Sequence, residues 1–112
     1  MVVRWRGDGG HGPIHRHVAT TTVLVLAGEQ RLWDVLADGR RGPERVRRAG
    51  GYALSTGDAH AHLESGGLEG GLVFFGNHAS NGVLYEIRDE NGALLVNTTI
   101  ESLVADWQAN AV

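Results

Sequence analysis

The chain has 112 residues, a formal net charge of −3 and no cysteine, so it fits a single domain over 1–112 and excludes disulfides and thiol nucleophiles. No apolar run approaches the roughly 20 residues that span a bilayer, and no signal-peptide pattern opens the chain, which favours a cytoplasmic location without membrane association. The arginine-rich segment 40–48 is interrupted by glycine, proline and glutamate, so it indicates a hairpin with solvated sides and does not favour nucleic-acid binding.

The 17 glycines are spread through the chain and separate short segments from one another. This spacing predicts short strands joined by turns, as in an all-β sandwich or barrel. In chain order, strands are expected at 2–5, 14–27, 31–36, 44–48, 52–54, 60–63, 72–75, 83–87 and 93–96. Turns are expected at 28–29, 38–39, 50–51, 57–58 and 89–92.

The end of the chain has a different period. Apolar residues in 100–107 recur at i, i+3, i+4 and i+7, which is typical of a helix. Thr98 and Glu101 have the S/T-x-x-E spacing of a capping box. The pattern predicts one helix from about Ile100 to Gln108, with its apolar stripe against the barrel.

The six histidines are clustered, and this is the most informative feature of the sequence. Alternate residues of a strand share a face, so His15 and His17 point the same way. Two imidazoles at this spacing can approach one divalent ion at about 2.0–2.1 Å. The alternative is a pair of partly exposed histidines on a polar strand. Without cysteine, any metal must be held by histidine, aspartate and glutamate.

The spacing of the histidines resembles the two motifs of the cupin superfamily. His15-Arg16-His17, followed by a turn at Gly28, is similar to the first motif, and the segment 55–60, which ends in His60, is similar to the second, P-x-G-x-x-H. The resemblance implies a double-stranded β-helix, a jelly-roll-like barrel, with His15, His17 and His60 on one metal ion. The chain departs from the pattern in three places: Ser55 replaces the proline, no carboxylate lies at 20–22, and Glu64 stands where an asparagine is expected.

A narrower resemblance supplies a fourth ligand. The segment Gly28 to Asp34 is similar to the G-x-W-x-Y-x-E pattern of cupins like 2,4′-dihydroxyacetophenone dioxygenase and of the zinc-binding cupin domain of certain anti-sigma factors. The resemblance places Asp34 at the position of the metal-binding glutamate, although a surface carboxylate is the alternative. His62 shares a face with His60, so it could replace His60 or hydrogen-bond nearby, whereas Glu64 is expected at the surface.

The resemblance implies an Fe(II) dioxygenase that cleaves a carbon–carbon bond of a small hydroxy-ketone or diketone. The ligand types suit Fe(II), Mn(II), Ni(II) and Zn(II) alike, so they do not select the metal. Two alternatives remain: a zinc-binding sensor or ligand-binding module without catalysis, and a metal-assisted polyketide cyclase or isomerase. The expected partners are a small-molecule substrate and a second copy of the chain in a homodimer.

Overall fold

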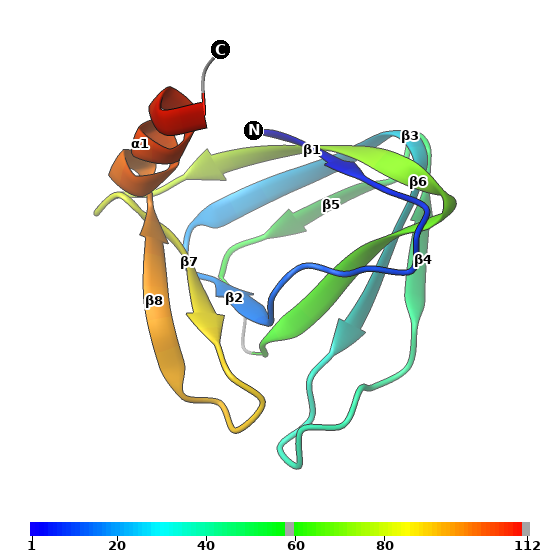
Figure 1. Cartoon of the computed structure of the whole chain (residues 1–112), viewed down its shortest axis with the longest axis horizontal. Helices are drawn as coiled ribbons and strands as arrows, with labels where there is room; N and C mark the ends of the chain where they lie inside the picture. The colour runs from blue at the N-terminus through cyan, green and yellow to red at the C-terminus, as the bar shows by residue number, and fades with distance from the viewer. Residues whose placement is uncertain (58–59, 111–112) are drawn as a thin grey trace.

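The computed structural model describes residues 1–57 and 60–110. Its elements are β1 (Val2–Trp5), β2 (His15–His17), β3 (Thr20–Asp34), β4 (Arg45–Arg48), β5 (Tyr52–Ser55), β6 (His62–His78), β7 (Val83–Arg88), β8 (Leu94–Thr99) and α1 (Ile100–Asn110). The strands form one antiparallel sheet in the order β4-β3-β6-β2-β7-β8, with β1 added to β6 and β5 added to β3 (Figure 1). The predicted all-β class with a C-terminal helix is confirmed, while the sheet itself is not closed.

Two long strands organise this sheet. β3 and β6 pair from Thr20↔His78 to Asp34↔His62, and their register shifts on both sides of Gly28. Figure 1 shows both strands turning at the middle, so that the two halves of the sheet face each other. One half carries β1 and β5, and the other carries β2 and β4. This folding places β2 beside the first half of β6.

The bend depends on glycine at two facing positions. Gly28 has a φ of +66°, and a Cβ there would lie 2.4 Å from the carbonyl oxygen of Gly70. A Cβ on Gly71 would lie 2.1 Å from the carbonyl oxygen of Glu29. Only glycine permits such close approach of two backbones. The prediction of a turn at 28–29 is therefore wrong, because the chain bends there within β3 and does not reverse its direction.

The strand expected over 14–27 is interrupted. The backbone N–H groups of Val18 and Ala19 both donate to the carbonyl oxygen of Leu84, at 2.9 and 3.0 Å, so the ladder breaks at this point. β2 pairs with β6 and β7, whereas β3 begins at Thr20 and pairs with β4, β5 and a different part of β6. The predicted hairpins over 31–48 and 83–96 are confirmed by the pairings β3–β4 and β7–β8.

The apolar core lies between the two halves of the sheet. Its buried cluster is Val23, Val25, Val73 and Phe75, with Val3, Trp5 and Ala53 packed against it. The other side of the same interior is polar, because several buried side chains there carry nitrogen or oxygen, among them His15, His17, Gln30, His62, Glu64 and Ser65. This polar interior is where the candidate site lies.

The C-terminal helix forms as predicted, but it begins and packs differently. Its cap is one residue later than expected, since Thr99 Oγ1 accepts from Ser102 N at 3.1 Å and Ser102 Oγ accepts from Thr99 N at 2.9 Å. No residue of α1 is buried, and Trp107 is 73% exposed, so the predicted packing of the apolar stripe against the barrel is wrong. Among the described residues, no helix is long and apolar enough to cross a membrane.

Candidate metal centre

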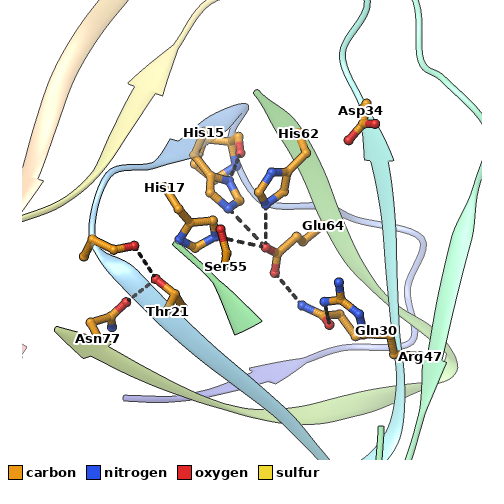
Figure 2. Close-up of polar contacts among 12 residues, drawn as sticks. His15, His17, Thr21, Gln30, Asp34, Arg47, Ser55, His62, Glu64 and Asn77 are labelled. Atoms are coloured by element: carbon orange, nitrogen blue, oxygen red, sulfur yellow. Dashed lines mark hydrogen bonds and ion pairs between the residues drawn. The ribbon is translucent and has the colours of Figure 1, made fainter. Parts of the chain in front are cut away.

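Four buried side chains from two strands converge in the polar interior (Figure 2). His15 and His17 are alternate residues of β2, and His62 and Glu64 are alternate residues of β6. Alternation puts both members of each pair on one face of their strand. The register His15↔His62 then places the two pairs side by side. One ligand atom from each residue lies within 4.8 Å of the other three.

The distances in this cluster are close to the spacing of ligands around one ion. Glu64 Oε1 lies 2.9 Å from His62 Nε2, 3.1 Å from His15 Nε2 and 3.7 Å from His17 Nε2. Two atoms that are each about 2.1 Å from one ion, at angles of 90–110°, lie roughly 3.0–3.4 Å apart. The three imidazoles and the carboxylate therefore fit a divalent metal without a large rearrangement.

Hydrogen bonds on the outer side of the cluster orient two of the ligands. His15 Nδ1 lies 2.9 Å from the carbonyl oxygen of Pro13, which can only accept, so this nitrogen donates. His15 Nε2 faces the cluster, where it offers a lone pair to a metal when the ring is neutral and donates to Glu64 Oε1 when the ring is protonated. The fully buried Gln30 donates from Nε2 to Glu64 Oε2 at 3.0 Å, while Arg47 Nη1 donates to Gln30 Oε1 at 3.0 Å. Glu64 thus keeps Oε1 toward the three imidazoles, as a metal site requires.

The cluster holds Glu64 in its charged form. Burial raises the pKa of the Glu64 carboxyl, but hydrogen bonds with His15, His17 and His62 outweigh burial and hold this pKa well below its usual range. A buried carboxylate is costly unless it is paired with cations. Here the cation can be a protonated imidazole of the cluster or a metal ion bound among the four residues.

The structure places the predicted ligands in two groups. His15 and His17 belong to the cluster, as expected. His60 is exposed and precedes the first residue of β6, so it is not among the four converging residues. Asp34 ends β3, where its carboxylate lies 2.7 Å from Arg45 Nη2, and it is not among them either. Both residues instead line the cavity that reaches the cluster.

His62 and Glu64 complete the cluster of four candidate ligands. His62 was the open alternative to His60, but Glu64 was expected at the surface and is in fact 2% exposed. The signal for both was present, since His62-Leu63-Glu64 has the same alternate spacing as His15-Arg16-His17. Two such pairs on adjacent strands are enough to make a four-ligand site.

Two cavities adjoin the cluster, and both have His17 and Glu64 in their lining. A cavity of about 210 Å³ is lined by His17, His62 and Glu64 together with the polar side chains Asp34, Arg45, Arg47 and His60. A second cavity of about 200 Å³ is lined by His15, His17 and Glu64 together with the apolar side chains Met1, Val3, Trp5, Phe75 and Tyr85. The four candidate ligands are therefore buried but have open space beside them.

Comparison with known proteins adds no functional assignment. No protein-family model matches the chain, and no curated protein matches it. The crystal structure of protein NMB1881 from Neisseria meningitidis is similar over 70% of each chain, with 20% sequence identity and a TM-score of 0.47. A similarity at this level carries no argument about the fold or the function of this chain.

Proposed function

We propose that this chain is a mononuclear metal-dependent protein of the cupin type that binds one divalent ion through His15, His17, His62 and Glu64. The observation that carries the proposal is the convergence of three imidazoles and one carboxylate, all buried, whose ligand atoms lie within 4.8 Å of one another. Nitrogen and oxygen donors without thiolate suit Fe(II), Mn(II), Ni(II) and Zn(II), and we propose Fe(II) as the working metal.

We further propose that the site is catalytic and that the protein is an Fe(II) dioxygenase, which cleaves a carbon–carbon bond of a small hydroxy-ketone or diketone. When bound, the ion would supply Lewis-acid and redox chemistry. The protein residues would bind and orient the substrate: the apolar cavity can take its hydrocarbon part and exclude water there, while its oxygen atoms face the cluster. The His15-Arg16-His17 part of the resemblance to carbon–carbon-cleaving cupins supports this reaction class, since His60 and Asp34 lie outside the cluster. The two adjoining cavities support access by a small molecule.

The rival function is a zinc-binding sensor that does not catalyse a reaction. Four protein donors are enough to fill a tetrahedral zinc site, which would leave no position for a substrate. The two functions therefore differ in whether an added ligand can reach the metal.

A pair of histidine variants tests the site. His62→Ala should lower metal affinity by at least about 100-fold, because even partners outside the ligand shell contribute 10–100-fold. His60→Ala should keep full metal content, because His60 lies outside the cluster. Metal per chain is measured by elemental analysis after purification without added metal, and circular dichroism checks that both variants fold.

Equal metal content in the two variants would overturn the proposed ligand set. If the metal content of the two variants supports the four proposed ligands, the reaction is tested next. The measurement is oxygen consumption by the iron-loaded protein with hydroxy-ketones and diketones. A metal-loaded protein whose spectrum is unchanged by every bidentate oxygen ligand would favour the sensor.

A further inference from the structure

One half of the sheet is apolar on both of its faces. Its strands lie in the order β1-β6-β3-β5, and alternate residues of each strand point inward to the core or outward. The outward residues of one row cross all four strands in register: Val2, Phe74, Leu24 and Tyr52. An antiparallel sheet that faces water on one side normally carries polar residues there, so an apolar outer face is expected to be covered.

The row beside it keeps this face flat and satisfies its hydroxyl group. A Cβ on Gly76 would lie 3.3 Å from Phe74 Cε1, so the Phe74 ring lies over the backbone of the glycine. Thr22, the register partner of Gly76, donates its hydroxyl to the carbonyl oxygen of Gly76 at 3.3 Å. In the other half of the sheet the outward positions hold charges, such as the pair Arg16–Glu86 at 2.8 Å. The apolar outer face is therefore a feature of one half only.

We call this surface the outer apolar face. Leu26 and Leu54 extend the row on either side, since they follow Leu24 and Tyr52 by two residues on antiparallel strands. The face consists of Val2, Leu24, Leu26, Tyr52, Leu54 and Phe74. All of these side chains except Leu24 are exposed to solvent.

The apolar stripe of α1 is a second uncovered surface. It consists of Ile100, Leu103, Val104 and Trp107, and no residue of α1 is buried. The helix continues directly from the end of β8 (Figure 1), and the Ile100 N–H donates to the carbonyl oxygen of Gly82 at 3.0 Å. Because this bond fixes the start of the helix beside the residue that precedes β7, the stripe stays exposed within one copy of the chain.

The charges of the two surfaces are complementary. α1 contains Glu101 and Asp106, which lie on the two sides of its stripe, and it has no basic residue. The outer apolar face has no acidic residue and is bordered by Arg4, the register partner of Leu72. A helix packed on this face brings unlike charges together, whereas two α1 helices packed on each other would bring like charges together.

The two surfaces together are large enough for a stable interface. Their exposed members range from Phe74 at 39% to Trp107 at 73%. Since a large side chain offers roughly 150–250 Å², the two surfaces leave on the order of 800 Å² of apolar area per chain. Stable interfaces of standard size bury about 800 Å² per partner. Packing a helix on a sheet is also one of the common ways in which apolar faces are covered.

We propose that the occupant of the outer apolar face is a second copy of this chain, whose α1 stripe lies on the face. In a two-fold dimer each copy gives its helix and receives that of its partner, so the same contact forms twice. The inference goes beyond the proposed function and is independent of it, because none of the four candidate metal ligands belongs to either surface.

The test measures the dimer dissociation constant by sedimentation over a range of protein concentrations. Leu54→Glu in the outer apolar face and Trp107→Glu in the stripe should each weaken the dimer at least about tenfold, because each places a charge in an apolar contact. An equal mixture of the two variants should dimerise more tightly than either variant alone. A mixed pair keeps one intact contact, between the helix of the Leu54→Glu chain and the face of the Trp107→Glu chain.

Leu68→Glu is the matched control, since Leu68 is 86% exposed and belongs to neither surface. It should leave the dimer unchanged, and equal weakening by all three variants would reduce the effect to added negative charge and overturn the inference. Circular dichroism checks folding, and Leu54→Ser with Trp107→Ser repeats the mixing test if a glutamate variant folds poorly.

The other outcomes identify other occupants. Weakening by Trp107→Glu alone would indicate a helix–helix dimer, and weakening by Leu54→Glu alone would indicate a sheet–sheet dimer. A monomer at every concentration would leave both surfaces to a different protein. Each of these results, or a mixture no tighter than its components, would overturn the inference.

Discussion

Glu86 shows how a single carboxylate can make stability depend on pH in this fold. Its Oε1 lies 2.8 Å from Arg16 Nε and 2.8 Å from Arg88 Nη2, so it joins β2 to β7. Hydrogen bonds from Arg16 and then Arg88 hold the pKa of Glu86 below its usual value. A depressed pKa means that the stabilisation is complete above the unfolded-state pKa of about 4.3 and is lost as the pH falls through the folded-state pKa.

We therefore expect Glu86→Gln to lower the free energy of unfolding by about 1 kcal/mol at pH 7. The difference from the unmodified protein should shrink as the pH is lowered, because the protonated carboxyl then resembles the amide. Urea unfolding over a pH series measures this change. Glu69→Gln, at an exposed position of β6, is the control, and a difference that stays constant down to low pH would contradict the role of the charge.

Residue-scale reasoning from the sequence identified half of the candidate site. The spacing of His15 and His17 is enough to put them on one strand face, and this prediction holds. His60 and His62 are also two residues apart, so both would lie on the same face of a strand. Choosing between them requires knowing where β6 begins and which residue faces β2. That depends on the pairing His15↔His62, which is non-local and has no local sequence signal. Glu64 was assigned to the surface for the same reason, since burial of a charge follows from its partners.

At the scale of the element, the bend shared by β3 and β6 predicts that a glycine there is needed for two reasons, its positive φ and the close approach of two backbones. Gly28→Ala should cost about 3 kcal/mol, because it combines a left-handed backbone with the close approach to Gly70. Gly92→Ala, in the β7–β8 hairpin, should cost only about 1–2 kcal/mol, because its φ is +85° but no atom lies within 4 Å of the added Cβ. Equal losses in urea unfolding would contradict the close approach at the bend.

Elements with local signals were predicted well, and their surroundings were not. The hairpins over 31–48 and 83–96 and the helix at the end of the chain follow from turn residues and periodicity. Periodicity says which residues of α1 share a face but not whether another element covers that face, and here none of them is buried. The arginines of β4 show the same limit, because alternation predicts two faces without saying which one borders a cavity.

At the scale of the whole molecule, composition and turn spacing were sufficient for an all-β chain with a C-terminal helix. They could not give the order β4-β3-β6-β2-β7-β8, because most of these neighbours are far apart in sequence. The cupin barrel stays part of the proposal, since the sheet in the structure is not closed. The homodimer stays a prediction.

The position of β2 has a consequence for the unbound protein. β2 has only three residues, and a single register pair, His15↔His62, joins it to β6. Such a short pairing gives little enthalpy against the entropy of closing the long chain segment between these residues. A bound ion would tether both strands at that point and act as a covalent staple does, by removing conformations from the open chain.

Hydrogen exchange should reveal this tether. On adding metal, the backbone amides of β2 should exchange at least about tenfold more slowly, because local opening of β2 now requires release of the ion. The amides of β5, a strand of four residues that contributes none of the four ligands, should change little. Equal slowing in both strands would mean that the ion stabilises the domain only globally. Selective slowing would mean that the bound ion adds to the pairing with β7 in keeping β2 closed against β6, so that metal supply would govern how often β2 opens.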